Sequence, residues 1–317
     1  MSEIVNPAKN QLHKLESEGV PNPFKDVDFA DLELSLYRPR TFFSILLSWI
    51  VTLMTFLALI PLFTVLWMLL WRGGKRLTLA LFTQLPPAPL ERGGGFGNAI
   101  VGTLIMVGIA TLITVPFGVL TGVYLAQAKD SKFASAVRFA AKILTGFPSI
   151  LAGVFAYGAI VLVTGGFSAL AGGVALSILM LPTIILTSEN AIAMVPPKMK
   201  EASIGMGATT TQTALMVLLP TAMPGILTGV MLAVARAAGE TAPLLFTALF
   251  SNYWLMSHGR FNLMQPTASL AVLIYNFSAM PFANQVELAW AAALVLVLMV
   301  LATNLIGKSL SSEQLHQ

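Results

Sequence analysis

The sequence predicts an all-α, polytopic membrane protein with six transmembrane helices. Of its 317 residues, 56% are hydrophobic and only 10% are charged, and the mean hydropathy is +0.81. A soluble protein of this length cannot bury so much apolar surface. In lipid, the backbone polar groups must be paired within each spanning segment, and a helix of about 20 apolar residues meets that requirement.

Six apolar runs of sufficient length lie between a polar N-terminal tail, residues 1–41, and a C-terminal tail, residues 308–317. A further run, Ala268–Phe282, has an apolar part too short to cross and is stopped by Pro281, so we expect it to form a helix on the outer face. The predicted spans, which together form a transmembrane domain over 42–307, are residues 42–71, 99–127, 144–164, 167–188, 224–250 and 287–307.

The distribution of lysine and arginine predicts that both termini are cytoplasmic. With six spans, the segments on the N-terminal side hold twelve of the 18 basic residues and the opposite segments hold five, while Arg236 falls within a span. Basic residues favour the cytoplasmic side of a membrane. Arg72, Lys75 and Arg76 cluster in the first outer loop and are an exception to this pattern.

The composition excludes several kinds of site. The chain has no cysteine and only three scattered histidines, so we expect no metal site. The net charge of +4 is not accompanied by a basic stripe with interleaved aromatics, so we expect no nucleic-acid partner. The run Gly93–Gly97 lacks the Lys-Ser/Thr of a nucleotide-binding loop, and we interpret it as a flexible connection.

The long polar segment over residues 189–223 predicts a cytoplasmic coupling loop. Pro196 and Pro197 suit the first turn of a helix, so a short helix is expected to begin there. Gly205 and Gly207 permit the positive φ angles of a sharp turn. A second short helix is expected from about 211 to 219, ending before Pro220. Two such helices form a knob that can fill a groove on a partner.

Two charged residues, Arg236 and Glu240, fall near the middle of the predicted fifth span. Charge at that depth costs about 2.5–3.5 kcal/mol on insertion scales, so both should face protein, water or substrate. Together with Gly225, Gly229 and Ala233 they form one small and polar helix stripe. Two interpretations remain open: a fixed salt bridge that holds the bundle together, or a contact along the path of an anionic substrate.

The polar segment resembles the EAA loop of ABC-importer permeases. The resemblance is carried by Glu201-Ala202-Ser203-Ile204-Gly205-Met206-Gly207 and by Val217-Leu218-Leu219-Pro220, with every spacing kept. It implies the permease fold with a coupling helix that inserts into a cytoplasmic ATPase. The residues that it assigns to ATPase coupling are Glu201, Ala202, Ser203, Gly205, Gly207, Leu219 and Pro220.

Further segments look like the PstA type of permease in bacterial phosphate ABC importers, and the similarity covers about residues 75–307. It implies a phosphate path through Arg236, Glu240 and Thr241. The segments that carry it are Asn98–Thr103, Gly146–Ile150, Val195–Thr213 and, most specifically, Ala235-Arg236-Ala237-Ala238-Gly239-Glu240-Thr241-Ala242-Pro243-Leu244-Leu245.

The resemblance also implies a multi-pass protein of the bacterial inner membrane that works by alternating access. Its expected partners are membrane lipid, a second permease of the PstC type, an ATPase dimer of the PstB type and a periplasmic phosphate-binding protein of the PstS type. The chain has no nucleotide-binding motif, so we expect it to be no enzyme itself and to bind no cofactor, with ATP and Mg on the ATPase.

Alternative functions remain open at this stage. Within the class, a permease for sulfate, molybdate or another oxyanion shares the docking loop. An ion-coupled secondary transporter would also carry charges within the membrane. That alternative predicts transport without any ATPase and gives the long loop no purpose. A structural or assembly protein of the membrane is a weaker third alternative.

Overall fold

The computed structural model describes residues 39–257 and 260–313. The chain divides into two units, Met1–Thr64 and Val65–Gln317. The predicted N-terminal tail lies outside the described residues as far as residue 38, and so do the last four residues of the predicted C-terminal tail.

The first unit consists of the N-terminal part of helix α2, which covers Pro39–Met68. Large apolar side chains are exposed along this part of the helix, including Phe43 and Trp49 at 66% and 70%. The hydroxyls of Ser48 and Thr52 donate to backbone carbonyls four residues earlier, at 2.9 and 2.8 Å. A helix that is apolar on all sides and pairs its own polar groups is suited to lipid or to a partner protein.

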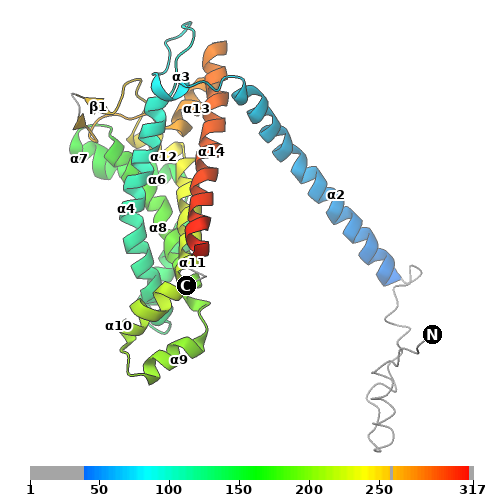
Figure 1. Ribbon diagram of the computed structural model, residues 1–317, viewed down its shortest axis with the longest axis vertical. Helices are drawn as coiled ribbons and strands as arrows, with labels where there is room; N and C mark the ends of the chain where they lie inside the picture. The colour runs from blue at the N-terminus through cyan, green and yellow to red at the C-terminus, as the bar shows by residue number, and fades with distance from the viewer. Residues whose placement is uncertain (1–38, 258–259, 314–317) are drawn as a thin grey trace, which may run out of the picture. The chain divides into compact units, whose positions relative to one another are not determined.

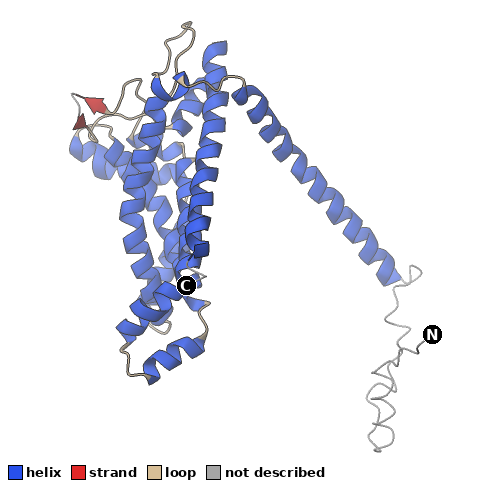
Figure 2. Ribbon diagram, viewed as in Figure 1, coloured by secondary structure: helices blue, strands red, loops and turns tan. Residues whose placement is uncertain are grey.

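The second unit is almost entirely helical, which confirms the predicted fold class (Figure 2). Its π-helical segments are labelled η. The elements are η2 (Leu69–Gly73), α3 (Ala80–Thr83), α4 (Gly97–Gln127), α5 (Lys132–Thr145), α6 (Ser149–Ala156), η3 (Tyr157–Val161), α7 (Leu162–Thr164), α8 (Ala169–Ala193), α9 (Pro197–Gly205), α10 (Thr210–Gln212), η4 (Thr213–Leu218), α11 (Leu219–Ala238), α12 (Ala242–Thr247), β1 (Met256–Ser257), β2 (Arg260–Phe261), α13 (Leu270–Ser278) and α14 (Ala283–Glu313).

The core of the second unit lies between the long helices α4, α8, α11 and α14, of which α4 and α8 make the most extensive contact. Met106 of α4, Met180 of α8 and Ile226 of α11 are fully buried there. The predicted small stripe on α11 faces α8, because a side chain at Gly225 would meet Ala191 and one at Gly229 would meet Thr187. Small residues thus allow close helix approach, as expected in lipid.

The two ends of this bundle carry different elements (Figure 1). Helices α9 and α10 lie at one end, here called the α9 end. The opposite end, here called the α13 end, holds α3, α12, α13 and the short β hairpin, in which Met256 pairs with Phe261. Helix α14 runs from the α13 end toward the α9 end.

In the described residues, five helices are long and apolar enough to cross a membrane, and a bent pair is a sixth candidate. The bent pair joins α5 to the segment Ser149–Thr164 at an angle of 107°. The third predicted span, 144–164, is therefore wrong at its start. Helix α5 ends at Thr145 and the chain turns before Pro148, which caps α6, because a residue before proline is pushed out of helical geometry.

The fifth predicted span, 224–250, is also wrong. One continuous helix covers Thr210–Ala238, so there is no separate helix that ends before Pro220. The π-helical η4 ends two residues before Pro220 and widens the helix where proline donates no hydrogen bond. The helix ends at Ala238, and the apolar residues after the break at 239–241 form the short α12.

Other predicted boundaries shift by at most six residues. Helices α2 and α4 agree with the first two predicted spans to within a few residues. Helix α8 extends five residues beyond the predicted 188, and α14 continues to Glu313, so the stretch from 308 to 313 is helical rather than a tail. No proline occurs there to end the helix. The expected helix in Ala268–Phe282 is confirmed as the nine-residue α13.

The glycine-rich run is not an open linker. Phe96 is completely buried, and its backbone N–H donates to the carbonyl of Leu81 at 2.9 Å. The N–H of Gly95 donates to the carbonyl of Leu85 at 3.0 Å. The prediction of a flexible connection is therefore wrong, because these bonds fold the run against α3.

Candidate coupling hairpin and substrate path

The predicted coupling residues lie on the α9–α10 hairpin, residues 197–212. Helix α9 begins at Pro197, as the sequence predicts, with Pro196 at its N-cap. Gly207 has φ +88°, a left-handed conformation that glycine adopts without strain. Gly205 is the last residue of α9 and has no positive φ, so only one of the two expected glycines makes the turn. This hairpin spans about half the predicted loop, since α8 and α11 extend into it.

Ser203 holds α9 against the next helix. Its side chain is 3% exposed, and its hydroxyl lies 3.0 Å from the hydroxyl of Thr213. Thr209 and Gln212 form a capping box at the start of α10, which pairs two otherwise unsatisfied N–H groups. Ser203 is thus an internal brace, while Glu201 and Ala202 beside it are exposed.

The outer surface of the hairpin is unusually apolar for a polar segment. Ile204 is 51% exposed and Met206 is 83% exposed. Gly205 is exposed too, and a side chain there would meet nothing within 4 Å. Of the remaining coupling candidates, Leu219 is half-buried and packs on the core, whereas Pro220 is exposed. Exposed apolar side chains beside small residues are typical of a surface that docks on another protein.

The structure moves Arg236 and Glu240 from the middle of a span to the end of a helix. Arg236 lies in the last turn of α11, and Glu240 follows in the break at residues 239–241. This helix end is still inside the bundle. A small cavity is lined by Ala238 together with Thr103 of α4 and Thr303 of α14, so α11 ends level with the interior of both neighbours.

Arg236 and Glu240 lie close together without a tight ion pair. The Arg236 Nε and the Glu240 Oε1 are 3.4 Å apart, and the two side chains are 46% and 17% exposed. Thr241 is half-buried, and its hydroxyl does not cap α12. The break therefore gathers a guanidinium, a carboxylate and a hydroxyl within six residues, and the guanidinium retains donors that the carboxylate does not occupy.

The structure contains a second charged pair that the sequence analysis does not predict. Arg138 of α5 contacts Glu189 of α8 at 2.7 Å and also donates to the carbonyl of Leu125 at 3.2 Å. The pair joins three helices near the α9 end. A signal was present in the sequence, since Glu189 lies three residues after Leu186, the end of an apolar run, where a charge close to the membrane needs a partner.

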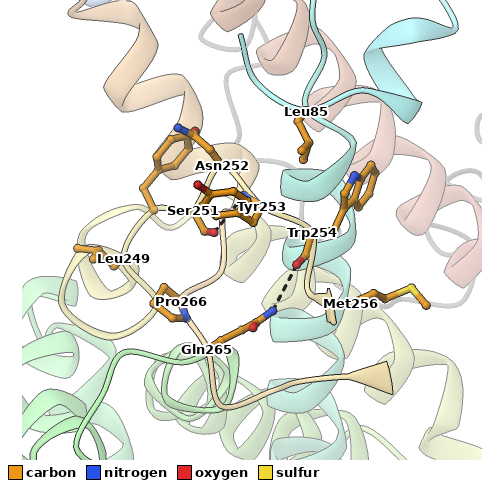
Figure 3. Close-up of a pocket in the computed structure, with 10 residues that line it drawn as sticks. Leu85, Leu249, Ser251, Asn252, Tyr253, Trp254, Met256, Gln265 and Pro266 are labelled. Carbon is orange, nitrogen blue, oxygen red and sulfur yellow. Dashed lines mark hydrogen bonds between the residues drawn. The ribbon is translucent and has the colours of Figure 1, made fainter. Parts of the chain in front are cut away.

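The α13 end contains a cavity of about 780 Å³. Figure 3 shows its lining, which includes Leu249, Tyr253 and Trp254, with the Gln265 side chain donating to the carbonyl of Trp254 at 3.3 Å. Neither Arg236 nor Glu240 lines this cavity. Its neutral side chains offer no paired cation for an anion, so we place the candidate path at the break instead.

The fold and the exposed hairpin define a class of helical membrane permease. Residues 115–313 match the family described as "Binding-protein-dependent transport system inner membrane component". The protein is thus a multi-pass component of the inner membrane.

Sequence similarity to named permeases identifies the family within this class. The chain is 44% identical over 242 residues to the phosphate transport system permease protein PstA of Haemophilus influenzae, which covers 76% of this chain and 84% of that protein. It is 38% identical to the PstA protein of Yersinia pestis, with 81% and 87% covered, and 34% identical to PstA 1 of Mycobacterium tuberculosis, with 91% and 92% covered. The chain belongs to the PstA family of phosphate transport permeases.

Solved structures show the same fold. A chain of the MetNI methionine ABC transporter matches with a TM-score of 0.56 at 22% identity, covering 68% of this chain and 94% of that one. A chain of a bacterial alginate ABC transporter matches with a TM-score of 0.60 at 14% identity, covering 87% and 97%. Family membership implies an ABC transporter complex that also contains a partner permease, an ATPase and a binding protein.

Proposed function

We propose that this chain forms part of the phosphate path of an ATP-driven importer and that Arg236, Glu240 and Thr241 contact phosphate along it. The observation that carries the proposal is the break at the end of α11. There, a half-exposed arginine and a carboxylate lie inside the length of the helix bundle. A charge at this depth needs protein, water or an anion beside it.

The chemistry of the break suits phosphate. The planar guanidinium of Arg236 matches two phosphate oxygens. The carboxylate of Glu240 repels a fully ionised anion but accepts a hydrogen bond from a protonated phosphate oxygen. Sulfate has no such proton at neutral pH, so Glu240 provides a means to discriminate between the two anions.

The α9–α10 hairpin supplies the proposed connection to ATP hydrolysis. We infer that Glu201, Ala202, Gly205, Ile204 and Met206 seat in a groove of an ATPase dimer of the PstB type, which binds ATP and Mg. Closure of that dimer would move the hairpin. Because η4 continues directly into α11, the same helix carries Thr213 at one end and Arg236 at the other. Motion of the hairpin thus reaches the break along one continuous helix.

The proposal also specifies the remaining partners and the orientation of the chain in the membrane. The α9 end faces the cytoplasm together with both termini. The second permease is of the PstC type, and a PstS-type binding protein delivers phosphate at the α13 end. Alternating access then exposes the break first to one side and then to the other.

The test is uptake by the complete transporter reconstituted in vesicles. With Glu240→Gln, the ratio of phosphate to sulfate uptake should fall by roughly ten-fold or more, because the repulsive charge is lost. Asp130→Asn, which neutralises an exposed carboxylate on the loop after α4, is the matched control and should leave the ratio unchanged.

Two results would contradict this function. An unchanged ratio in Glu240→Gln would remove the carboxylate from anion selection and favour the fixed salt bridge. Phosphate uptake by the chain without any ATPase would instead indicate an ion-coupled transporter.

A further inference from the structure

Three cations of the α13 end surround one cavity, here called the basic pocket. Arg72, Lys75 and Arg76 line it together with the indoles of Trp71 and Trp290, and its volume is about 630 Å³. These are the residues that break the expected charge distribution across the membrane. The preference of basic residues for the cytoplasmic side does not explain why these three residues line one pocket.

Two of the cations are held over aromatic rings. The Arg72 Cζ lies 5.4 Å from the ring centre of Trp290, and the Lys75 Nζ lies 4.4 Å from that of Trp71. Among the residues that the structure describes, neither cation has a carboxylate within 4 Å. Contact with a ring face positions a cation but leaves its N–H donors available.

The third cation is already paired and acts as a brace. Arg76 Nε lies 3.3 Å from Glu287 Oε2, and the guanidinium also donates to the side-chain oxygen of Asn284. The Asn284 amide in turn donates to the backbone carbonyls of Glu91 and Gly93 at 2.8 and 3.3 Å. These bonds fix the first turn of α14 against the loop before α4, so the wall of the pocket is preformed.

The pocket lies where an apolar helix meets polar loops. Gly73, next to Arg72, approaches the backbone of Trp290, two turns into α14. Trp71 is 57% exposed and stacks on Trp67 at 6.3 Å between ring centres. Tryptophans gathered near the ends of apolar helices are typical of the membrane interface, at the depth of lipid headgroups.

We propose that the basic pocket binds the phosphate of an anionic phospholipid headgroup. Arg72 donates two parallel hydrogen bonds to phosphate oxygens, and Lys75 adds a point charge. The apolar side of the pocket, formed by Met280, Pro281 and Val286, covers the glycerol and upper acyl carbons. A free phosphate ion has no apolar part to bury there, so the composition of the lining favours a lipid.

The test is native mass spectrometry of the complete transporter, incubated with phosphatidylglycerol or with phosphatidylcholine. We expect retained phosphatidylglycerol in excess of phosphatidylcholine. The double variant Arg72→Gln, Lys75→Gln should weaken phosphatidylglycerol binding roughly 30-fold, at about 1 kcal/mol for each basic residue near the surface. The matched control Lys129→Gln, Lys132→Gln neutralises two exposed lysines near the α9 end and should leave this binding unchanged.

A second variant separates charge from packing. Arg72→Lys keeps the charge and loses only the paired hydrogen bonds to phosphate, so binding should stay within about five-fold of that of the unaltered protein. If Arg72→Lys loses as much as the double variant, the site depends on packing against Trp290 and the proposal is contradicted. Equal binding in the double variant and the unaltered protein would also overturn it, as would displacement of the lipid by inorganic phosphate, which would identify a free-anion site.

Discussion

Loops at the α13 end are joined across the sequence by side-chain hydrogen bonds, whereas the hairpin at the α9 end projects with little cover. Asn98 donates to the carbonyl of Ser251 at 2.8 Å, and Thr103 accepts from the N–H of Leu270 at 2.9 Å. The hairpin has the brace between Ser203 and Thr213 and leaves Ile204 and Met206 exposed. The α13 end is held together by hydrogen bonds between its own loops, and the hairpin has the composition of a surface that is completed by a partner.

The difference follows from what each end must do in the proposed cycle. An end that receives a binding protein needs loops in fixed positions, and hydrogen bonds between distant loops provide them. A coupling element must instead move as one body, so it needs an internal brace and a free outer face.

The largest effect is expected for Met206→Asp. Because Met206 is 83% exposed, the chain itself should fold normally. Burying an unpaired carboxylate in an apolar interface costs several kcal/mol, so co-purification of the ATPase should fall by roughly 100-fold or more. Met264→Asp changes an exposed methionine at the opposite end and should leave ATPase co-purification intact. Equal ATPase recovery in the two variants would refute the contrast between the ends.

Asn98→Ala should destabilise the α13 end without uncoupling the hairpin. Asn98 is 2% exposed and holds the carbonyls of Ser251 and Tyr253. Leaving buried partners unpaired costs about 1–3 kcal/mol, which lowers the melting temperature by roughly 2–10 °C. ATPase co-purification should persist. Asn252→Ala changes an exposed asparagine and is the control, whose melting temperature should not change. If Asn98→Ala no longer co-purifies with the ATPase, the two ends are not independent.

Gly207→Val should distort the hairpin itself. A β-branched residue at φ +88° is strained by about 1–2 kcal/mol or more, although no neighbour obstructs the side chain. We expect ATP-driven phosphate uptake to fall roughly ten-fold. Gly166→Val, at another open position without a positive φ, should transport normally. If both variants transport alike, the turn at Gly207 is not needed for coupling.

The smallest effect is expected for Ser203→Ala, which removes only the brace to Thr213. The net contribution of one hydrogen bond is about 0.5–1.5 kcal/mol, so uptake should fall roughly two- to ten-fold. Thr213→Ala should have a similar effect, and the double variant should be no worse than either single one. Additive losses would show that Ser203 contacts the partner rather than Thr213.

The sequence predicts the hairpin better than it predicts the helices around it. Local chemistry explains why: Pro197 starts α9 and Gly207 turns the chain, whatever the rest of the fold does. The assignment of the turn to both glycines was only half correct. Ser203 was interpreted as a small docking residue, because the sequence does not show that Thr213 lies against it.

The sequence predicts Arg236 and Glu240 as path residues near the middle of a span, whereas the structure places them at the end of α11. An apolar run does not reveal a break, so residues 239–250 were joined to the fifth span. The Gly239 at the helix end and Pro243 after it were the available signals. The Arg138–Glu189 pair and the basic pocket depend on contacts between distant helices, which one sequence does not specify.

The central claim is that the exposed face of the α9–α10 hairpin lies in the cytoplasm against an ATPase. The chain has no cysteine, so Ala202→Cys introduces a single thiol on that face. A membrane-impermeant maleimide should label this variant in inside-out vesicles but not in intact cells, and the assembled ATPase should block the labelling. Asn252→Cys at the other end should show the reverse sidedness. Labelling of Ala202→Cys from outside, or no protection by the ATPase, would contradict the account.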